Sequence, residues 1–246
     1  MPDIRMAGLS RWRNGMKYYK VLKNDGSCCN GGRGKWHLPK GKRPGKWMPK
    51  INGELEPCAN GYHLCRPQDL IHWLDEAIFE VEFRGDVVED DDKIVVSEAR
   101  LLCKVEAWNE KNARLFAADC AERVLPFYEK DYPDDNRPRK AIQAARDYAN
   151  EKITKEELDA ARAAAWAAAR AAAWDAARAA AWDAAWVAAR AAAGEAAWAA
   201  AWDAASDAAR AAARAAARDA ARAAAWAAAW AAEREWQTKR LFEYLR

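Results

Sequence analysis

The feature that most constrains the fold of this chain is a tract of small and large residues that repeats in steps of four between residues 160 and 232. About two thirds of the tract is Ala, and a Trp or Arg occupies almost every fourth position. Ala is the strongest helix former, Arg is close behind it, no Pro interrupts the tract, and Gly194 is its one poor helix former. The whole tract is therefore predicted to be helical.

The four-residue step also predicts how such helices pack. Four residues advance about 400° around a helix, so the row of Trp and Arg drifts by about 40° per repeat and no straight face is apolar. Bulky rows separated by Ala grooves favour close crossings at about −50°. A single straight helix would leave its Trp side chains in water. We therefore expect the tract to fold back near Gly194 or near Ser206 and Asp207, or to pack against copies from other chains. The Trp residues are then core residues, and an exposed aromatic ladder that binds a ligand or nucleic acid is the alternative.

Composition divides the chain of 246 residues near residue 108. We expect an α+β protein, with a small α/β domain over residues 1–108 followed by an all-α, Ala-rich domain over residues 109–246. The elements expected in the first domain are a strand at 16–23, a short strand at 61–65, a helix from Pro67 that carries Trp73 and Leu74, and a β-hairpin of 78–84 and 94–105 with an acidic turn at 89–92.

Three helices are predicted to open the second domain. The first covers residues 109–124 and ends at Pro126. The second begins at a cap on Asn136. The third begins at Thr154, whose hydroxyl forms a capping box with Glu157, and it leads directly into the Ala tract.

Charge is distributed unevenly in the first domain. Residues 1–53 carry 13 Lys and Arg against two acidic residues, whereas residues 54–106 carry five basic residues against 14 acidic ones. A basic loop over residues 27–53 interleaves cations with aromatic side chains. Its candidate binding residues are Arg33, Lys35, Trp36, Lys40, Lys42, Arg43, Lys46 and Trp47. This mixture predicts contacts to the phosphates and bases of a nucleic acid. The alternatives are a solvated loop neutralised by the acidic half of the domain, and docking on an acidic protein.

Six cysteines occur without a secretory signal peptide, which predicts a cytoplasmic location and reduced thiols. Cys58, His63 and Cys65 lie close in sequence, but their spacing is not one that zinc sites use, so we predict no metal and no cofactor. The longest uncharged stretch of the Ala tract, residues 223–232, is too short to cross a bilayer.

Residues 113–161 carry a recognisable set of motifs, namely Leu115-Phe116-Ala117, Cys120-Ala121-Glu122-Arg123, Tyr132-Pro133-Asp134-Asp135-Asn136 and Ile153-Thr154-Lys155-Glu156-Glu157-Leu158. This run resembles a family of bacterial and phage proteins named putative immunity proteins, in which a similar Ala, Trp and Arg tract follows. The family takes its name from genomic association with toxin systems, so the resemblance implies a toxin or defence effector as partner. The first domain is similar to an uncharacterised phage and bacterial domain through Gly61-Tyr62-His63, Trp73-Leu74 and Lys93-Ile94-Val95-Val96-Ser97-Glu98.

One enzymatic interpretation is open. A first strand ending in Tyr18-Tyr19-Lys20, a Tyr62-His63 strand and a later strand with Ser97-Glu98 resemble the layout of ADP-ribosyltransferases. That resemblance implies Glu98 as the carboxylate that polarises the ribose of NAD, with Tyr62 or His63 lining the nicotinamide pocket. No other catalytic signature is evident in the sequence.

The sequence as a whole predicts a non-enzymatic interaction protein, an immunity or anti-defence factor that binds and blocks a protein partner. Three alternatives remain: a nucleic-acid binder that uses the basic loop, an ADP-ribosyltransferase-like enzyme, and a structural protein that forms oligomers through its Ala-rich helices.

Overall fold

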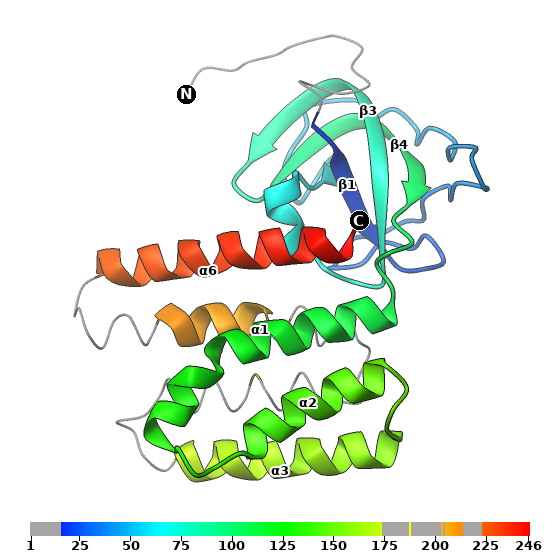
Figure 1. Cartoon of the computed structure of the whole chain (residues 1–246). Helices are drawn as coiled ribbons and strands as arrows, with labels where there is room; N and C mark the ends of the chain where they lie inside the picture. The colour runs from blue at the N-terminus through cyan, green and yellow to red at the C-terminus, as the bar shows by residue number, and fades with distance from the viewer. Residues whose placement is uncertain (1–15, 174–186, 188–202, 204, 214–222) are drawn as a thin grey trace. The chain divides into compact units, whose positions relative to one another are not determined.

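The computed structural model describes residues 16–173, 187, 203, 205–213 and 223–246 of the chain (Figure 1). The chain divides into two compact units, Met1–Trp108 and Asn109–Arg246. The described part of the first unit is built around an antiparallel sheet, and that of the second unit consists of helices. The α+β class predicted from the sequence is therefore confirmed.

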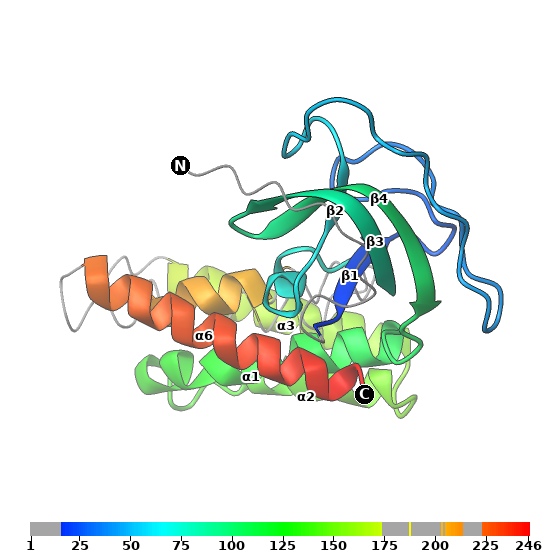
Figure 2. The ribbon, with the colours of Figure 1, turned by 90° about the horizontal axis from the view of Figure 1, so that it is seen from above.

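The described residues of the first unit form a sheet of four strands in the order β1-β3-β4-β2, with every neighbouring pair antiparallel. The strands are β1 Tyr18–Leu22, β2 Tyr62–Leu64, β3 Ala77–Asp90 and β4 Lys93–Lys104. β3 and β4 form the predicted hairpin, which is long and curved in Figures 1 and 2, and Asp91 and Asp92 make its turn. The short strands expected at 16–23 and 61–65 are confirmed as β1 and β2.

β3 extends beyond the predicted strand at 78–84, because Gly85 allows the chain to continue through a bulge. The register with β4 shifts between Arg84 and Val87. Gly85 has a φ of +82°, and a Cβ at this position would lie 2.2 Å from the Oγ of Ser97. That hydroxyl oxygen accepts a hydrogen bond from the backbone N–H of Asp86 at 2.9 Å. The bulge therefore depends on glycine, and it carries the strand on to Asp90.

The helix predicted from Pro67 is a short 3₁₀ segment, η2 Pro67–His72. Trp73 and Leu74, expected on this helix, lie beyond its end. The backbone N–H of Trp73 closes the last turn on the carbonyl of Leu70 at 3.0 Å. The indole Nε1 of Trp73 instead donates to the carbonyl oxygen of Asp92 at 3.0 Å, which fixes the ring beside the β3–β4 turn. This shortening is typical of 3₁₀ helices, which seldom run beyond a few residues.

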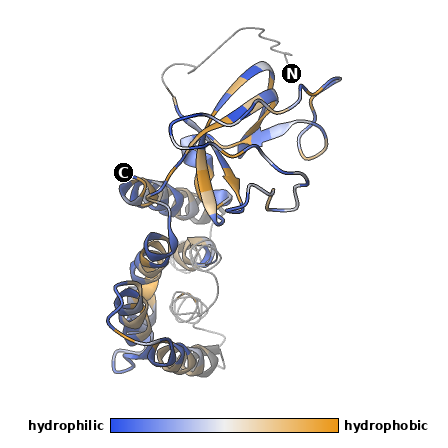
Figure 3. Cartoon of the chain, turned by 90° about the vertical axis from the view of Figure 1, so that its right-hand side faces the viewer, coloured by the Kyte–Doolittle hydropathy of each residue, from blue (hydrophilic) through white to orange (hydrophobic). Residues whose placement is uncertain are grey.

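The apolar core of the first unit collects side chains from its strands and from the segment between β1 and β2. Its buried members include Leu22, Leu64, Phe79 and Leu101 from the strands, together with Trp36. Figure 3 shows the strongly hydrophobic residues concentrated in the strands, whereas the helices mix hydrophilic and hydrophobic residues. Apolar side chains that alternate with polar ones along the strands thus form this core, in agreement with the predicted β-hairpin.

The described helices of the second unit are α1 Glu110–Asp131, α2 Arg137–Ala149, α3 Lys155–Ala173 and α6 Ala223–Tyr244, and residues 205–213 are also helical. α3 begins at the predicted capping box, since the Thr154 hydroxyl accepts the N–H of Glu157 at 3.3 Å and the Glu157 carboxylate accepts the N–H of Thr154 at 2.8 Å. α2 begins where predicted, with Asn136 as its N-cap residue, but the Asn136 side chain makes no cap bond. The Asp135 carboxylate accepts the N–H of Arg137 at 3.1 Å.

The prediction that Pro126 ends the first helix is wrong. α1 continues to Asp131 with Pro126 inside it, and Figure 1 shows the helix bending along its length. Pro126 lacks the N–H that would bond to the carbonyl of Glu122, but both residues are exposed, so water can reach that carbonyl. Leu125 and Tyr128 are 1% exposed, and their burial supports the helix on both sides of the proline.

All described residues of the Ala tract are helical, namely 160–173, 187, 203, 205–213 and 223–232. Ser206 and Asp207 themselves are helical, within the described segment 205–213. Gly194, the other expected turning point, lies outside the described residues. Ala residues such as 165, 168, 208 and 209 are fully buried, whereas Trp166 and Trp230 are only half-buried. These two indoles are thus not fully buried core residues, and the expectation for the other Trp residues of the tract falls on side chains outside the described part of the chain.

Candidate functional site

The basic segment 27–53 is hydrogen-bonded to itself and to the sheet over much of its length. It starts with a small hairpin bridged between Ser27 and Lys35, whose tight turn has Asn30 and Gly31 at positive φ. Its end follows β4, where three backbone N–H groups between residues 45 and 51 donate to carbonyls of β4 at 2.8 to 2.9 Å. The cations of this segment are therefore presented from a fixed backbone.

The two aromatic candidates of this segment are engaged within the protein. Trp36 is 4% exposed and packs in the core, with the edge of its ring against Tyr62 at 5.3 Å between centroids. Trp47 is half-buried, and the guanidinium groups of Arg84 and Arg100 lie 4.2 and 4.8 Å from its ring centroid. Trp36 cannot stack on a base without leaving the core. The ring of Trp47 already makes cation–π contacts with two guanidinium groups.

The charged candidates are accessible. Arg33, Lys40, Lys42, Arg43 and Lys46 are exposed, and none of them forms an ion pair among the residues that the structure describes. Lys35 differs, because its Nζ lies 3.0 Å from the Asp25 carboxylate. The segment thus presents a positive surface of exposed cations, whereas its two aromatic candidates are engaged within the protein.

The three residues of the enzymatic hypothesis are not gathered into one site. Tyr62 and His63 are neighbours on β2, so their side chains point to opposite faces of the strand. Burial, and after it the Glu98 carboxylate, raise the pKa of Tyr62, which places Glu98 near Tyr62. The Glu98 carboxylate accepts bonds from the Nε and Nη2 of Arg84 at 3.0 and 2.7 Å. The ADP-ribosyltransferase hypothesis therefore rests on sequence resemblance alone.

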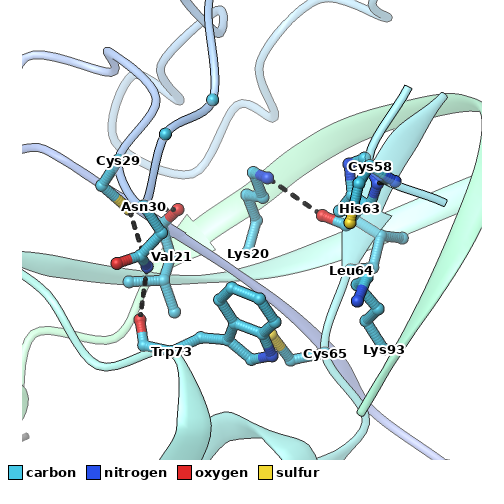
Figure 4. A pocket seen from close by; sticks show the side chains of 12 residues that line it. Lys20, Val21, Cys29, Asn30, Cys58, His63, Leu64, Cys65, Trp73 and Lys93 are labelled. Atoms are coloured by element: carbon cyan, nitrogen blue, oxygen red, sulfur yellow. Dashed lines mark hydrogen bonds between the residues drawn. The ribbon is translucent and has the colours of Figure 1, made fainter. Parts of the chain in front are cut away.

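His63 lines a pocket of about 290 Å³ that the sequence did not indicate (Figure 4). The pocket lies among β1, β2, the turn at residues 29–32 and Trp73. The backbone N–H of Cys58 donates to the Nε2 of His63 at 2.8 Å, so this ring nitrogen is an acceptor. Burial, and then the charges of Lys20 and Lys93, lower the pKa of His63, which favours the neutral imidazole.

Two lysines line this pocket in different ways. The Nζ of Lys93 lies 2.9 and 2.8 Å from the carboxylates of Asp90 and Asp92. The Nζ of Lys20 donates to the backbone carbonyl of His63 at 3.0 Å and lies 5.3 Å from the ring centroid of Trp36. Among the described residues no carboxylate pairs with Lys20. Within this part of the chain the Lys93 charge is therefore matched by carboxylates, and that of Lys20 is not.

Three cysteines also line the pocket. Burial raises the pKa of the Cys29 thiol to about 11 and that of the Cys65 thiol to about 12, so both are neutral at physiological pH. Cys58 is exposed. Across the part of the chain that the structure describes, no three His, Cys, Asp or Glu side chains are placed to hold a metal ion.

In the second unit, Asp119 of α1 joins three helices. One of its carboxylate oxygens accepts a bond from the Nη2 of Arg146 on α2 at 2.7 Å. The other accepts from the Nε of Arg240 at 2.7 Å and from the hydroxyl of Tyr244 at 2.6 Å, both on α6. Asp119 is 9% exposed, and each oxygen has a charge-assisted partner, so the network orients α2 and α6 on α1. An isolated acid in the apolar run Phe116 to Ala121 was the sequence signal for this network, but its partners could not be read from it.

A groove of about 490 Å³ lies on the surface beside this network, between α1 and α6. It is lined by Asp119, Glu122, Arg123, Trp236, Lys239, Arg240 and Glu243. The guanidinium of Arg123 lies 5.3 Å from the ring centroid of Trp236, and its Nε lies 3.4 Å from the carboxylate of Glu233, which is 4% exposed. The groove thus combines one indole with interleaved charges of both signs.

A family match covers much of the helical part of the chain. Residues 104–202 match the family model described as Imm-5 like putative immunity protein. The matched region contains α1, α2 and α3, and it includes residues 113–161, where the resemblance was predicted. The predicted relationship to immunity proteins is thus confirmed for this region, and the similarity of the first domain to a phage and bacterial domain stays a prediction. No curated protein and no solved structure matches the chain.

None of the described helices has both the length and the apolar character that crossing a membrane requires.

Proposed function

We propose that this protein is an immunity factor whose helical unit binds a protein toxin or effector and blocks it through the groove between α1 and α6. The match of residues 104–202 to the immunity-protein family model carries the proposal. α1 lies inside the matched region and contributes Asp119, Glu122 and Arg123 to the groove. The proposal therefore connects the family's implied activity to a defined surface.

The chemistry of the groove suits protein recognition. Trp and Arg are the residues most enriched at positions that dominate binding energy in protein interfaces, and Trp236 and Arg123 are in contact here. Alternating acidic and basic side chains around them would select a partner with the complementary pattern. The Asp119 network holds both helices, so the surface needs little ordering on binding.

Capture from bacterial lysate with the full-length protein tests this proposal, with captured proteins identified by mass spectrometry. The Trp236→Ala variant removes the groove indole. Trp230→Ala is the matched control, because Trp230 is also half-buried on α6 and also contacts an arginine, yet it does not line the groove. We expect the wild-type protein and the Trp230→Ala variant to capture the same protein, and the Trp236→Ala variant to lose it by at least about tenfold in affinity. Equal capture by both variants would exclude the groove.

Nucleic-acid binding by the basic segment is the second candidate, and the exposed cations at residues 33, 40, 42, 43 and 46 favour it. Fluorescence anisotropy with a labelled single-stranded DNA tests it over a series of salt concentrations. Binding through phosphates weakens steeply with salt, and the Lys42→Gln/Arg43→Gln variant should lower the salt slope by roughly one to two. Lys111→Gln/Lys130→Gln is the control, since it removes two exposed cations from α1. If the two double variants behave alike, the DNA does not bind at the basic segment.

A further inference from the structure

The pocket of the first unit contains one cation, Lys20, that pairs with no carboxylate among the described residues. Lys20 lies in the middle of β1, and its half-buried side chain points toward His63 in Figure 4. Its ammonium has three donor hydrogens and, among the described residues, makes one hydrogen bond, to the His63 carbonyl at 3.0 Å. The ring of Trp36 provides a weak attraction at 5.3 Å. At least one donor thus remains for another acceptor.

Comparison with Lys93, the buried lysine of the pocket, shows what is missing at Lys20. Lys93 lies against Trp73 at 5.3 Å and has two carboxylates within 2.9 Å. Withdrawal of an ammonium from water is costly unless an anion compensates for it. Within the described residues Lys93 has that compensation and Lys20 does not. A bound anion at the pocket would supply it.

The remaining lining is apolar or neutral and would accept a compact organic body. Val21, Leu64 and Trp73 contribute apolar surface. The Cys29 and Cys65 thiols are held neutral by burial, so they do not repel an anion. The turn at residues 29–32 ends in two glycines, which add no side chains beyond those of Cys29 and Asn30 to that wall. The volume of about 290 Å³ lies at the lower end of the range for small-molecule sites.

We propose that this pocket binds a small organic carboxylate, whose ionised oxygens accept hydrogen bonds from the Nζ of Lys20 while its apolar body lies against Trp73. The site is in the first unit and does not depend on the partner binding assigned to the helical unit. A carboxylate fits because it adds the missing charge and because one or two oxygens suffice for a single ammonium. A larger polyanion would meet the carboxylates of Asp90 and Asp92 beside Lys93.

Benzoate is the probe, and benzamide, which has the same shape without the charge, is its control. Titration of the full-length wild-type protein by calorimetry should give a Kd for benzoate on the order of 1 mM, as expected of so small a ligand. Benzamide should bind at least about tenfold more weakly, since the charge-assisted bond is lost. Equal binding of the two probes, tighter binding of inorganic phosphate, or no benzoate binding would each overturn the proposal.

Thiol labelling locates the bound probe in the unmodified protein. Cys58 and Cys103 are both exposed, but only Cys58 lines the pocket. Benzoate should slow the alkylation of Cys58 by iodoacetamide, measured by peptide mass spectrometry, and leave the rate at Cys103 unchanged. Protection of both thiols, or of neither, would place the probe elsewhere.

Substitution of the lysine completes the test. Lys20→Met keeps most of the aliphatic stem and removes the charge, and Lys50→Met removes an exposed charge outside the pocket. We expect the Lys20→Met variant to lose at least about tenfold in benzoate affinity and the Lys50→Met variant to retain it. Circular dichroism establishes whether the Lys20→Met variant is folded. If it is not, the comparison of benzoate with benzamide in the wild-type protein tests whether the pocket binds a carboxylate. Unchanged affinity in a folded Lys20→Met variant would refute the role of Lys20.

Discussion

Asp135 is the residue whose contacts most clearly determine a local conformation in the helical unit. It lies between α1 and α2, where its carboxylate accepts the hydroxyl of Tyr128, the backbone N–H of Arg137 at 3.1 Å and the guanidinium of Arg137 at 2.9 and 2.6 Å. The bonds from Arg137, with a smaller contribution from Tyr128, lower the pKa of Asp135 from 3.8 to about 2. One ionised side chain therefore joins the end of α1 to the start of α2.

Replacement of this carboxylate should destabilise the helical unit in a pH-dependent way. We expect the Asp135→Asn variant to lose about 1 to 2 kcal/mol in free energy of unfolding at neutral pH, measured by urea denaturation. A lowered pKa in the folded state stabilises the protein above the unfolded value, and this contribution disappears as the pH falls through the folded value. The difference between the variant and the wild type should thus shrink between about pH 4 and pH 2.

Asp134 provides the control for this substitution. It is the preceding residue, it is exposed, and its side chain makes no hydrogen bond or ion pair within the described part of the chain. Asp134→Asn should leave the free energy of unfolding within about 0.5 kcal/mol of the wild type. If the Asp135→Asn variant lost the same free energy of unfolding at every pH, the charge of Asp135 would not be the cause of the stabilisation.

At the scale of secondary structure, Pro126 interrupts the backbone hydrogen bonds of α1. Its replacement measures what this interruption costs in stability. Pro126→Ala restores an N–H that can bond to the carbonyl of Glu122, but it also increases the freedom of the unfolded chain. Because the full helix-interior penalty of proline is partly offset in this way, we expect a net gain of about 1 kcal/mol in free energy of unfolding. Hydrogen exchange at the new amide reports directly on the restored bond.

Pro133 is the matched control for this change. It is exposed and lies in the connection between α1 and α2, where no helical bond is available to restore. Pro133→Ala should therefore give no gain. A loss of stability in the Pro126→Ala variant would mean that the bend at Pro126 is needed to bury Leu125 and Tyr128.

Elements that depend on neighbouring residues were predictable from the sequence, and those that depend on distant contacts were not. The capping box of Thr154 and Glu157 is formed within four residues, and the β3–β4 hairpin has its turn between its own strands. The persistence of α1 through Pro126 depends on packing by the rest of the unit. The extension of β3 past Gly85 depends on a close approach to Ser97 of another strand.

The candidate sites show the same division. The cations of the basic segment are visible in the sequence, but the burial of Trp36 results from its contacts with distant strands. Lys20 became a candidate only when the fold placed it beside His63, 43 residues away. Asp119 and Arg240 are 121 residues apart. Charge and composition therefore identify regions, and the fold decides which of their side chains can act on a ligand.

At the scale of the whole molecule, the division into Met1–Trp108 and Asn109–Arg246 makes Trp108 the last residue of the first unit. Trp108 is 1% exposed, and its Nε1 donates to the carbonyl oxygen of Asp75 at 2.7 Å. Its backbone N–H bonds to the carbonyl of Val105 at 3.0 Å. The ring thus belongs to the packing of the sheet unit, although it lies directly before the helical one.

A fragment of residues 1–108 should consequently fold by itself, with a β-rich circular dichroism spectrum and one cooperative urea transition. Within that fragment, Trp108→Ala should cost about 3 to 5 kcal/mol, because it leaves a cavity and an unpaired carbonyl at Asp75. Trp47→Ala is the control, since Trp47 is half-buried and its loss should cost less. An unfolded wild-type fragment would show that the sheet unit requires the helical unit, whereas a folded fragment insensitive to Trp108→Ala would show that the boundary lies before this residue.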